Sequence, residues 1–184
     1  MPAEIIDGKG VAKQVRERVE QAVEHLTAVP TLAVVLVGSD PASQVYVRNK
    51  GRQTEAVGMR SITKHLPETA TQEQVEAVLT ALNADDDVDG VLLQLPLPPG
   101  LDEAAAIALI DPAKDVDGLT ERSAGRLLLG LPSLRPCTPT GCVILAKEAL
   151  GDSLSGKHVV VIGRSILVGK PTALLFLEEN CTVS

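Results

Sequence analysis

Short, uninterrupted apolar segments alternate with helical patterns along most of this 184-residue chain. The clearest apolar segment is TLAVVLVG at 31–38, whose length and β-branched residues are typical of a buried strand. The segment 8–27 has valines at helical spacing and follows Asp7, which we expect to cap that helix. The segment 39–58 is also a predicted helix, with Pro41 near its first turn. Because strands joined by helical crossovers form a mostly parallel sheet with helices on both faces, the alternation predicts an α/β fold.

The alternation continues to about residue 110 and is then interrupted. We predict a strand at 59–66, a helix at 71–83, a strand ending at Pro96 and a short helix at 102–110. The prolines of residues 111–139 predict a loop-rich connection. The elements predicted after it are a helix from Pro139 to Leu150, a buried strand at 158–163, a loop and helix within 164–180, and the start of a strand at 181–184.

This order predicts two domains, a parallel-sheet catalytic domain at 1–138 and the first part of a Rossmann-type nucleotide domain at 139–184. A complete dinucleotide domain has two βαβαβ halves, and one βαβ unit takes about 30 residues. We therefore expect the chain to be a fragment with an incomplete nucleotide domain. The alternative is a complete small α/β domain whose last strand is left as a bare edge.

Composition narrows the class of partner. Apolar residues make up 45% of the chain, but Tyr46 and Phe176 are its only Phe, Tyr or Trp residues. The missing aromatic platforms and the net charge of −7 argue against nucleic acid as a ligand. Three cysteines without a CxxC pair indicate a reducing, cytoplasmic setting and no metal site. The sequence shows no signal pattern and no apolar run near the roughly 20 residues that span a bilayer, so we expect no membrane partner.

The first candidate site is YVRNK, in the helix that follows the strand at 31–38. Tyr46 and Lys50 are four residues apart and so share a helix face. A lysine beside a ring at the carboxyl end of a buried strand is placed where α/β sheets bind ligands, and it suits proton transfer. The alternative is a solvated lysine beside a packed tyrosine.

Two further polar groups follow predicted strands or loops. Gln94, in QLPLP, ends an otherwise apolar strand, and its amide needs a partner such as a lysine or a polar ligand. Asp117, in KDVDGL, has a carboxylate that could accept hydrogen bonds from ligand N–H groups. The alternatives are a Pro-rich turn at Gln94 and an Asx-turn at Asp117. The three aspartates at 85–87 are interpreted as a solvated turn.

The stretch VVVIGRSILVGKPT at 159–172 predicts a phosphate-binding turn between a strand and a helix. It is neither the G-x-G-x-x-G fingerprint nor a P-loop, because Gly163 is followed by Arg164 and Ser165 and the later spacing differs. An arginine directly after the strand suits a bidentate grip on a 2′-phosphate, which favours NADP over NAD.

In this order, the stretches VGSDPASQVYVRNK, DGVLLQLPLP, KDVDGL, PCTPTG and GRSILVGKP resemble the bifunctional methylenetetrahydrofolate dehydrogenase/methenyltetrahydrofolate cyclohydrolase family. The resemblance covers the whole chain but only about the first two thirds of a family member. It implies that Lys50 is the acid/base group, that Tyr46 packs against the folate ring system, that Gln94 tunes the lysine and that Asp117 grips the pterin. It also implies that Leu93, Gln94 and Leu95 line the folate site and that Gly163, Arg164 and Ser165 contact NADP.

The implied chemistry has two reactions on one carbon of a small folate substrate. The first is hydride transfer from the methylene bridge to NADP, and the second is hydrolysis of the methenyl cation to 10-formyltetrahydrofolate. The resemblance also implies a homodimer in the full-length protein. Because the family's remaining nucleotide-domain strands are missing, we expect this chain to bind NADP weakly. Gly51, directly after the lysine, departs from helix preference and costs about 1 kcal/mol relative to alanine.

Two rival interpretations remain. A Tyr-x-x-x-Lys pair is also catalytic in short-chain dehydrogenases, but those enzymes place the glycine-rich turn before the pair, whereas here Gly163 lies far after Lys50. The other rival is a non-catalytic folate-binding or assembly fragment.

Overall fold

A computed structural model describes residues 3–184, which form two compact units. We call Val15–Val116 the sheet unit. The turn unit consists of Asp117–Ser184 together with the residues as far as Gln14. The first helix, α1 (Gly8–Glu24), begins in the turn unit and ends in the sheet unit. Residues 1 and 2 of the predicted N-terminal domain lie outside the described residues.

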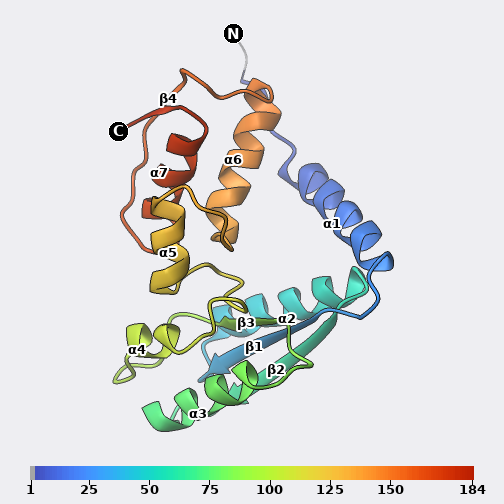
Figure 1. The fold of residues 1–184 in the computed structure, drawn as a ribbon, viewed down its shortest axis with the longest axis vertical. Helices are drawn as coiled ribbons and strands as arrows, with labels where there is room; N and C mark the ends of the chain where they lie inside the picture. Colours follow the sequence, from blue (N-terminus) through green and yellow to red (C-terminus); the bar gives the residue numbers. More distant parts are fainter. Residues whose placement is uncertain (1–2) are drawn as a thin grey trace. The chain divides into compact units, whose positions relative to one another are not determined.

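The sheet unit is built on three parallel strands in the order β2-β1-β3 (Figure 1). They are β1 (Thr31–Val37), β2 (Arg60–Leu66) and β3 (Gly90–Leu93). In the central strand, Val34 is level with Thr63 of β2 and Leu92 of β3. A central parallel strand is covered on both faces, which explains why β1 is apolar without alternation. The predicted α/β class is confirmed.

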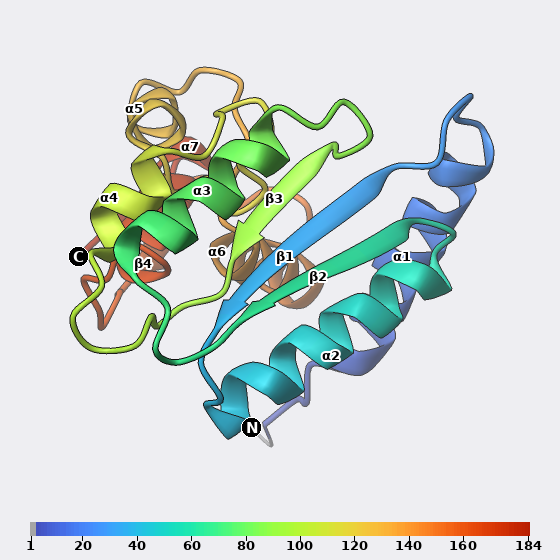
Figure 2. The same ribbon diagram turned by 90° about the horizontal axis from the view of Figure 1, so that it is seen from below.

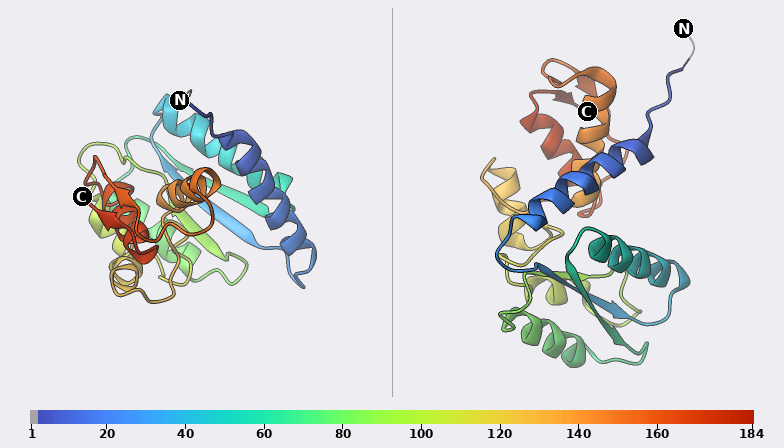
Figure 3. Two further views of the ribbon diagram at one scale, coloured as in Figure 1. Left: turned by 90° about the horizontal axis from the view of Figure 1, so that it is seen from above. Right: turned by 90° about the vertical axis from the view of Figure 1, so that its right-hand side faces the viewer.

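Helices cover both faces of this sheet. Figures 2 and 3 show α2 (Pro41–Ala56) on one side of the strands and α3 (Gln72–Asn83) on the other. Val47 of α2 packs with Val34, Leu36 and Leu92 of the sheet. The side of α3 that is buried carries Val75, Leu79 and Leu82. Burying one such side chain stabilises the fold by about 1.5–3 kcal/mol.

Side-chain hydrogen bonds cap the N-termini of α1, α2 and α3 close to the predicted starts of these helices. The Asp7 carboxylate accepts from the Gly10 backbone N–H at 3.0 Å, which confirms it as the cap of α1. Asp40 caps α2 by accepting from the Ser43 backbone N–H at 2.7 Å. That hydrogen bond lowers the pKa of Asp40. Thr71 and Gln74 form a capping box at the start of α3.

The loop-rich prediction for 111–139 is wrong in part. After α4 (Glu103–Ala108), the structure forms α5 (Glu121–Leu128) inside that segment. Thr120 caps α5 by accepting from the Ser123 backbone N–H at 3.2 Å, and Leu127 is buried. The flanking prolines and glycines hid this two-turn helix because its apolar pattern is too short to stand out.

The turn unit packs three helices around a small apolar core. These three helices are α5, α6 (Cys137–Leu150) and α7 (Gly169–Glu178), and α6 and α7 lie side by side (Figures 1 and 3). The buried core residues are Leu127, Val143, Leu154, Leu175, Phe176 and Cys181. An ion pair joins Lys147 of α6 to Glu179 at 2.7 Å. Helix α6 begins at Cys137, two residues before the predicted start at Pro139.

The buried strand predicted at 158–163 is much shorter and more exposed than expected. Of the predicted strand, only β4 (His158–Val159) forms ladder pairs, in parallel with β5 (Thr182–Val183). One further hydrogen bond joins the Val161 N–H to the Ser184 carbonyl at 2.8 Å. Val160 is 66% exposed and Ile162 is 98% exposed. The physical reason is that a strand extends only as far as its partner, and β4 has one short partner within residues 3–184.

No helix within residues 3–184 is long and apolar enough to cross a membrane.

Candidate functional site

The structure brings Lys50 and Gln94 together in the sheet unit. Lys50 lies in the second half of α2, and Gln94 follows the last residue of β3. The Lys50 Nζ donates to the Gln94 Oε1 at 3.2 Å. Lys50 is half-buried, and its amine has a specific partner at the carboxyl end of the sheet. An amine in this setting can exchange protons with a ligand that binds there.

Gln94 is fixed in the orientation that this contact needs. Its backbone N–H continues the ladder by donating to the Val35 carbonyl at 2.9 Å. Its side-chain Nε2 donates to the Leu95 carbonyl at 2.7 Å. With the amide nitrogen engaged, the amide oxygen faces the Lys50 amine. The two leucines on either side of Gln94 differ in burial, since Leu93 is buried and Leu95 is half-buried.

Tyr46 lies one helical turn before Lys50 and is 63% exposed. The predicted alternative of a packed tyrosine beside a solvated lysine is therefore the reverse of what the structure shows. The ring is open to solvent and the amine has a partner. A flat, exposed ring on the lysine face of α2 is available to stack against an aromatic ligand.

The loops after the strands meet at the same edge of the sheet. Gly38 follows β1 with a φ of +82°, and a Cβ there would lie 3.2 Å from the Pro98 ring of the loop after β3. The His65 ring nitrogen Nε2 lies 2.7 Å from the Gly38 carbonyl. This close approach and the left-handed backbone both favour glycine. The loops thus form one rim beside Lys50 and Gln94.

Asp117 is the first residue of the turn unit after Val116, and it is half-buried. It precedes Gly118, which has a φ of +63°. A Cβ on Gly118 would lie 2.7 Å from the Leu134 carbonyl oxygen, so the bend after Asp117 requires glycine.

The aspartates at 85–87 form an exposed turn, in which the Asp85 carboxylate accepts from the Asp87 N–H at 2.9 Å.

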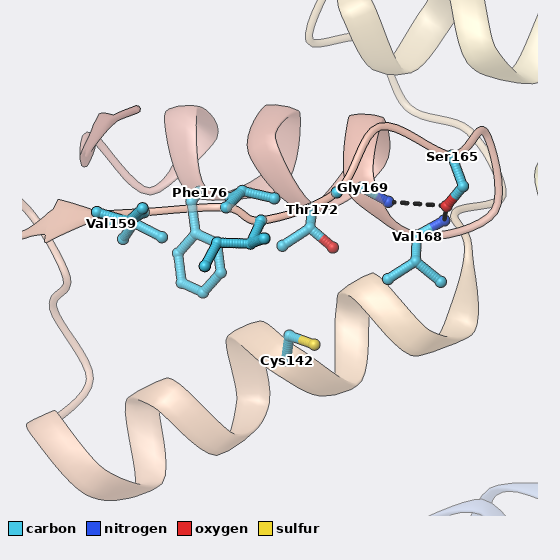
Figure 4. Close-up of a pocket in the computed structure, with 11 residues that line it drawn as sticks. Cys142, Val159, Ser165, Val168, Gly169, Thr172 and Phe176 are labelled. Atoms are coloured by element: carbon cyan, nitrogen blue, oxygen red, sulfur yellow. Dashed lines mark hydrogen bonds between the residues drawn. The ribbon is translucent and has the colours of Figure 1, made fainter.

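Gly163, Arg164 and Ser165 form the turn between β4 and α7, as predicted. The Ser165 Oγ accepts from the backbone N–H groups of Val168 and Gly169 at 3.1 and 3.2 Å (Figure 4). The turn closes on itself, because a Cβ on Gly169 would lie 2.4 Å from the Gly163 carbonyl carbon. Only glycine allows the two backbone segments to approach so closely.

A cavity of about 400 Å³ lies beside this turn. Gly163 and Ser165 line it, together with Cys142 of α6 and Thr172 and Phe176 of α7 (Figure 4). The Thr172 Oγ1 is buried and has no hydrogen-bond partner in the structure. Arg164 is exposed and does not line the cavity. The sequence did not indicate Cys142 or Thr172, since an isolated thiol or hydroxyl in a helix has no spacing signal.

These features fit a dinucleotide. The glycine pair gives a backbone surface without side chains, the Thr172 hydroxyl lacks a partner, and the exposed Arg164 guanidinium can pair with a phosphate. No cluster of three or more metal-ligating side chains occurs within residues 3–184. No disulfide joins Cys137, Cys142 or Cys181 in the part of the chain that the structure describes.

Comparison with known proteins identifies the family. The profile of the tetrahydrofolate dehydrogenase/cyclohydrolase catalytic domain matches residues 6–117. The chain belongs to the tetrahydrofolate dehydrogenase/cyclohydrolase family. The NAD(P)-binding domain of the same family matches residues 136–184. The resemblance inferred from the five sequence stretches is thereby confirmed.

Curated members of this family include the bifunctional protein FolD of Hyphomonas neptunium, which is 66% identical over all 184 residues. The FolD of Maricaulis maris is 60% identical. The chain spans 62% and 63% of the length of these two relatives.

Solved structures of family members share the fold. The bifunctional FolD of Campylobacter jejuni has a TM-score of 0.92 and 39% identity, over 98% of this chain and 65% of that one. The FolD of Trypanosoma brucei, solved with NADP and an inhibitor, has a TM-score of 0.92 and 34% identity, over 100% of this chain and 64% of that one.

Proposed function

We propose that this chain hydrolyses 5,10-methenyltetrahydrofolate to 10-formyltetrahydrofolate and contributes the folate site to oxidation of 5,10-methylenetetrahydrofolate with NADP. The observation that carries the proposal is the 3.2 Å contact between the Lys50 amine and the Gln94 amide at the carboxyl end of the sheet. Family membership supplies the substrate class, since the matching domain is named for both activities.

Lys50 is the proposed proton carrier. Water adds to the cationic methenyl carbon as the unprotonated Lys50 amine takes up the proton that water loses. The added hydroxyl then loses its proton to solvent and its oxygen forms the carbonyl as the bond from that carbon to N5 breaks. N5 takes the proton held by Lys50, and the formyl group stays on N10. The Gln94 oxygen keeps the amine at the rim through both proton transfers. One amine can serve the whole sequence because every bond change occurs at the same carbon or its nitrogens.

Tyr46 and Asp117 are proposed to hold the folate. The exposed Tyr46 ring can stack on the pterin, and a carboxylate such as Asp117 can accept hydrogen bonds from its amino and ring N–H groups. Leu93 and Leu95 flank Gln94 and are proposed to line the same site. We place the boundary between the folate and nucleotide domains at 138/139, near the start of the nucleotide-domain match at residue 136.

For the nucleotide we propose NADP, held by Gly163, Arg164 and Ser165. NADP, when bound, accepts a hydride from the methylene carbon. Arg164 follows β4 and is exposed, so its guanidinium can pair with a 2′-phosphate, which NAD lacks. We expect this chain to bind NADP weakly, because β4 has two residues and the apolar side chains of Val160 and Ile162 are uncovered. We also propose that the protein is cytoplasmic and that the full-length protein is a homodimer.

Hydrolysis of 5,10-methenyltetrahydrofolate by the 184-residue chain, followed without NADP, tests this function. We expect turnover above the spontaneous rate. Calorimetric titration with a folate analogue separates the remaining outcomes. Binding without turnover would favour a non-catalytic folate-binding fragment, and the absence of both would overturn the proposal.

A further inference from the structure

Lys114 places its ammonium against the end of a helix in the sheet unit. Its Nζ donates to the backbone carbonyls of Leu82, Asn83 and Asp85 at 3.2, 2.9 and 2.7 Å. An ammonium has three donors, so this set of acceptors is complete. The carbonyls belong to the last turn of α3 and the residues after it, which lack partners inside the helix. A cation at this position is also favoured by the helix dipole.

The backbone of Lys114 is tied to the sheet at the same time. The Val91 N–H of β3 donates to the Lys114 carbonyl at 2.8 Å, and Asp115 forms a parallel bridge with Val91. The approach is close, because a Cβ on Gly90 would lie 2.5 Å from the Val116 Cγ1. Residues 114–116 therefore lie against β3, joined to it by one isolated parallel bridge.

The turn before Lys114 is attached to the same end of α3. The Asn83 side chain accepts from the Asp111 N–H at 2.9 Å and donates to the Leu109 carbonyl at 2.6 Å. The Lys114 N–H in turn donates to the Asp111 carbonyl at 2.8 Å. Side-chain contacts from Asn83 and Lys114 thus fix both ends of the turn that leads into residues 114–116.

We infer that Lys114 is a positioning residue for the folate site. This inference rests on the proposed function. Asp117, the proposed pterin ligand, is three residues after Lys114, a reach of no more than about 10 Å along the chain. Residues 114–116 also lie along β3, whose end carries Gln94. Lys114 holds the start of the segment that leads to Asp117, and its three ammonium donors are all taken up by backbone carbonyls.

A role in positioning differs from a role in stability alone. A lysine that only caps α3 would, when replaced, lower the melting temperature and leave KM and kcat unchanged below it. A lysine that positions Asp117 would raise KM for the folate while the folded protein persists. Its effect would also depend on whether Asp117 is present, because residues that act through one another are not additive.

The experiment measures hydrolysis of 5,10-methenyltetrahydrofolate by four variants of the full chain. They are Lys114→Met, Asp117→Ala, the double variant, and Lys64→Met, which makes the same change at an exposed lysine of β2. Thermal unfolding of each variant sets an assay temperature well below every melting point. We expect Lys114→Met to raise KM about tenfold with kcat changed less than about twofold. We expect Lys64→Met to leave both unchanged.

The double variant decides the matter. We expect Lys114→Met to change KM by less than about twofold when Asp117 is already alanine. A full tenfold effect in that background, or an unchanged KM in Lys114→Met alone, would overturn the positioning role while the wild type remained active. An inactive wild type would instead overturn the proposed function, and this inference with it.

Discussion

The side chains of Lys50 and Gln94, 44 positions apart in the sequence, meet at 3.2 Å at the carboxyl end of the parallel sheet. One comes from the helix after the central strand and the other from the end of its neighbour. Because the Gln94 amide nitrogen donates to the Leu95 carbonyl, the amide oxygen faces the Lys50 amine. The contact therefore holds the amine that we propose as the proton carrier.

Replacing Gln94 by alanine removes the acceptor that holds the Lys50 amine. We expect kcat for methenyltetrahydrofolate hydrolysis to fall by about tenfold to a hundredfold, because proton transfer needs a positioned group. Steady-state kinetics checks this, with Gln21→Ala on the exposed side of α1 as the matched control. Wild-type kcat in Gln94→Ala would show that the amide does not position the amine.

Gly51→Ala tests the packing of α2. The glycine costs about 1 kcal/mol of helix stability relative to alanine. A Cβ at this position would meet only the Ser61 Oγ, at 3.4 Å, which is an ordinary contact. We therefore expect the substitution to raise the free energy of unfolding by up to about 1 kcal/mol in urea. A loss of stability would mean that α2 must approach β2 more closely than an alanine permits.

Gly169→Ala tests the close approach of backbone in the nucleotide turn. The new Cβ would lie 2.4 Å from the Gly163 carbonyl carbon and 2.5 Å from the Arg164 nitrogen, so the turn must open. We expect a loss of about 1–3 kcal/mol in unfolding free energy. Gly141→Ala in α6 is the control, because a Cβ there meets nothing within 4 Å. Equal stability of the two variants would contradict the geometry of the turn.

The cap at Asp40 gives a pH dependence of stability. The hydrogen bond from the Ser43 N–H lowers the pKa of Asp40 in the folded protein. The carboxylate therefore contributes stability that is fully present above its unfolded pKa of about 4 and is lost as pH falls through the lower folded pKa. Asp40→Asn keeps a capping oxygen but does not titrate. We expect the wild type to lose urea stability relative to this variant between pH 5 and pH 2; parallel curves would contradict the assignment.

Much of this architecture could be predicted from the sequence, because it depends on local patterns. The apolar run at 31–38, the strand at 59–66 and the helix between them were predicted from the sequence pattern and are present in the structure. The sequence indicated that the Gln94 amide needs a partner such as a lysine or a polar ligand, and the resemblance to the family implied that this lysine is Lys50. The resemblance to the family came from the order of five motifs, and the family match confirms it.

Other features depend on long-range packing and could not be predicted. The length of β4 is limited by its partner β5. The apolar run at 158–163 therefore could not predict that Ile162 is exposed. The two turns of α5 are stabilised by the Thr120 cap and the burial of Leu127 rather than by a long pattern. The three carbonyls around Lys114 lie about 30 positions away in the sequence, and no spacing rule links them.

Lys50→Met offers the most direct test of the account, because methionine keeps an unbranched apolar stem and removes only the amine. The measurement is kcat for hydrolysis of 5,10-methenyltetrahydrofolate, with Lys64→Met as the control at an exposed lysine. The account predicts a loss of at least about a hundredfold in Lys50→Met and none in Lys64→Met. Wild-type turnover by folded Lys50→Met would contradict it.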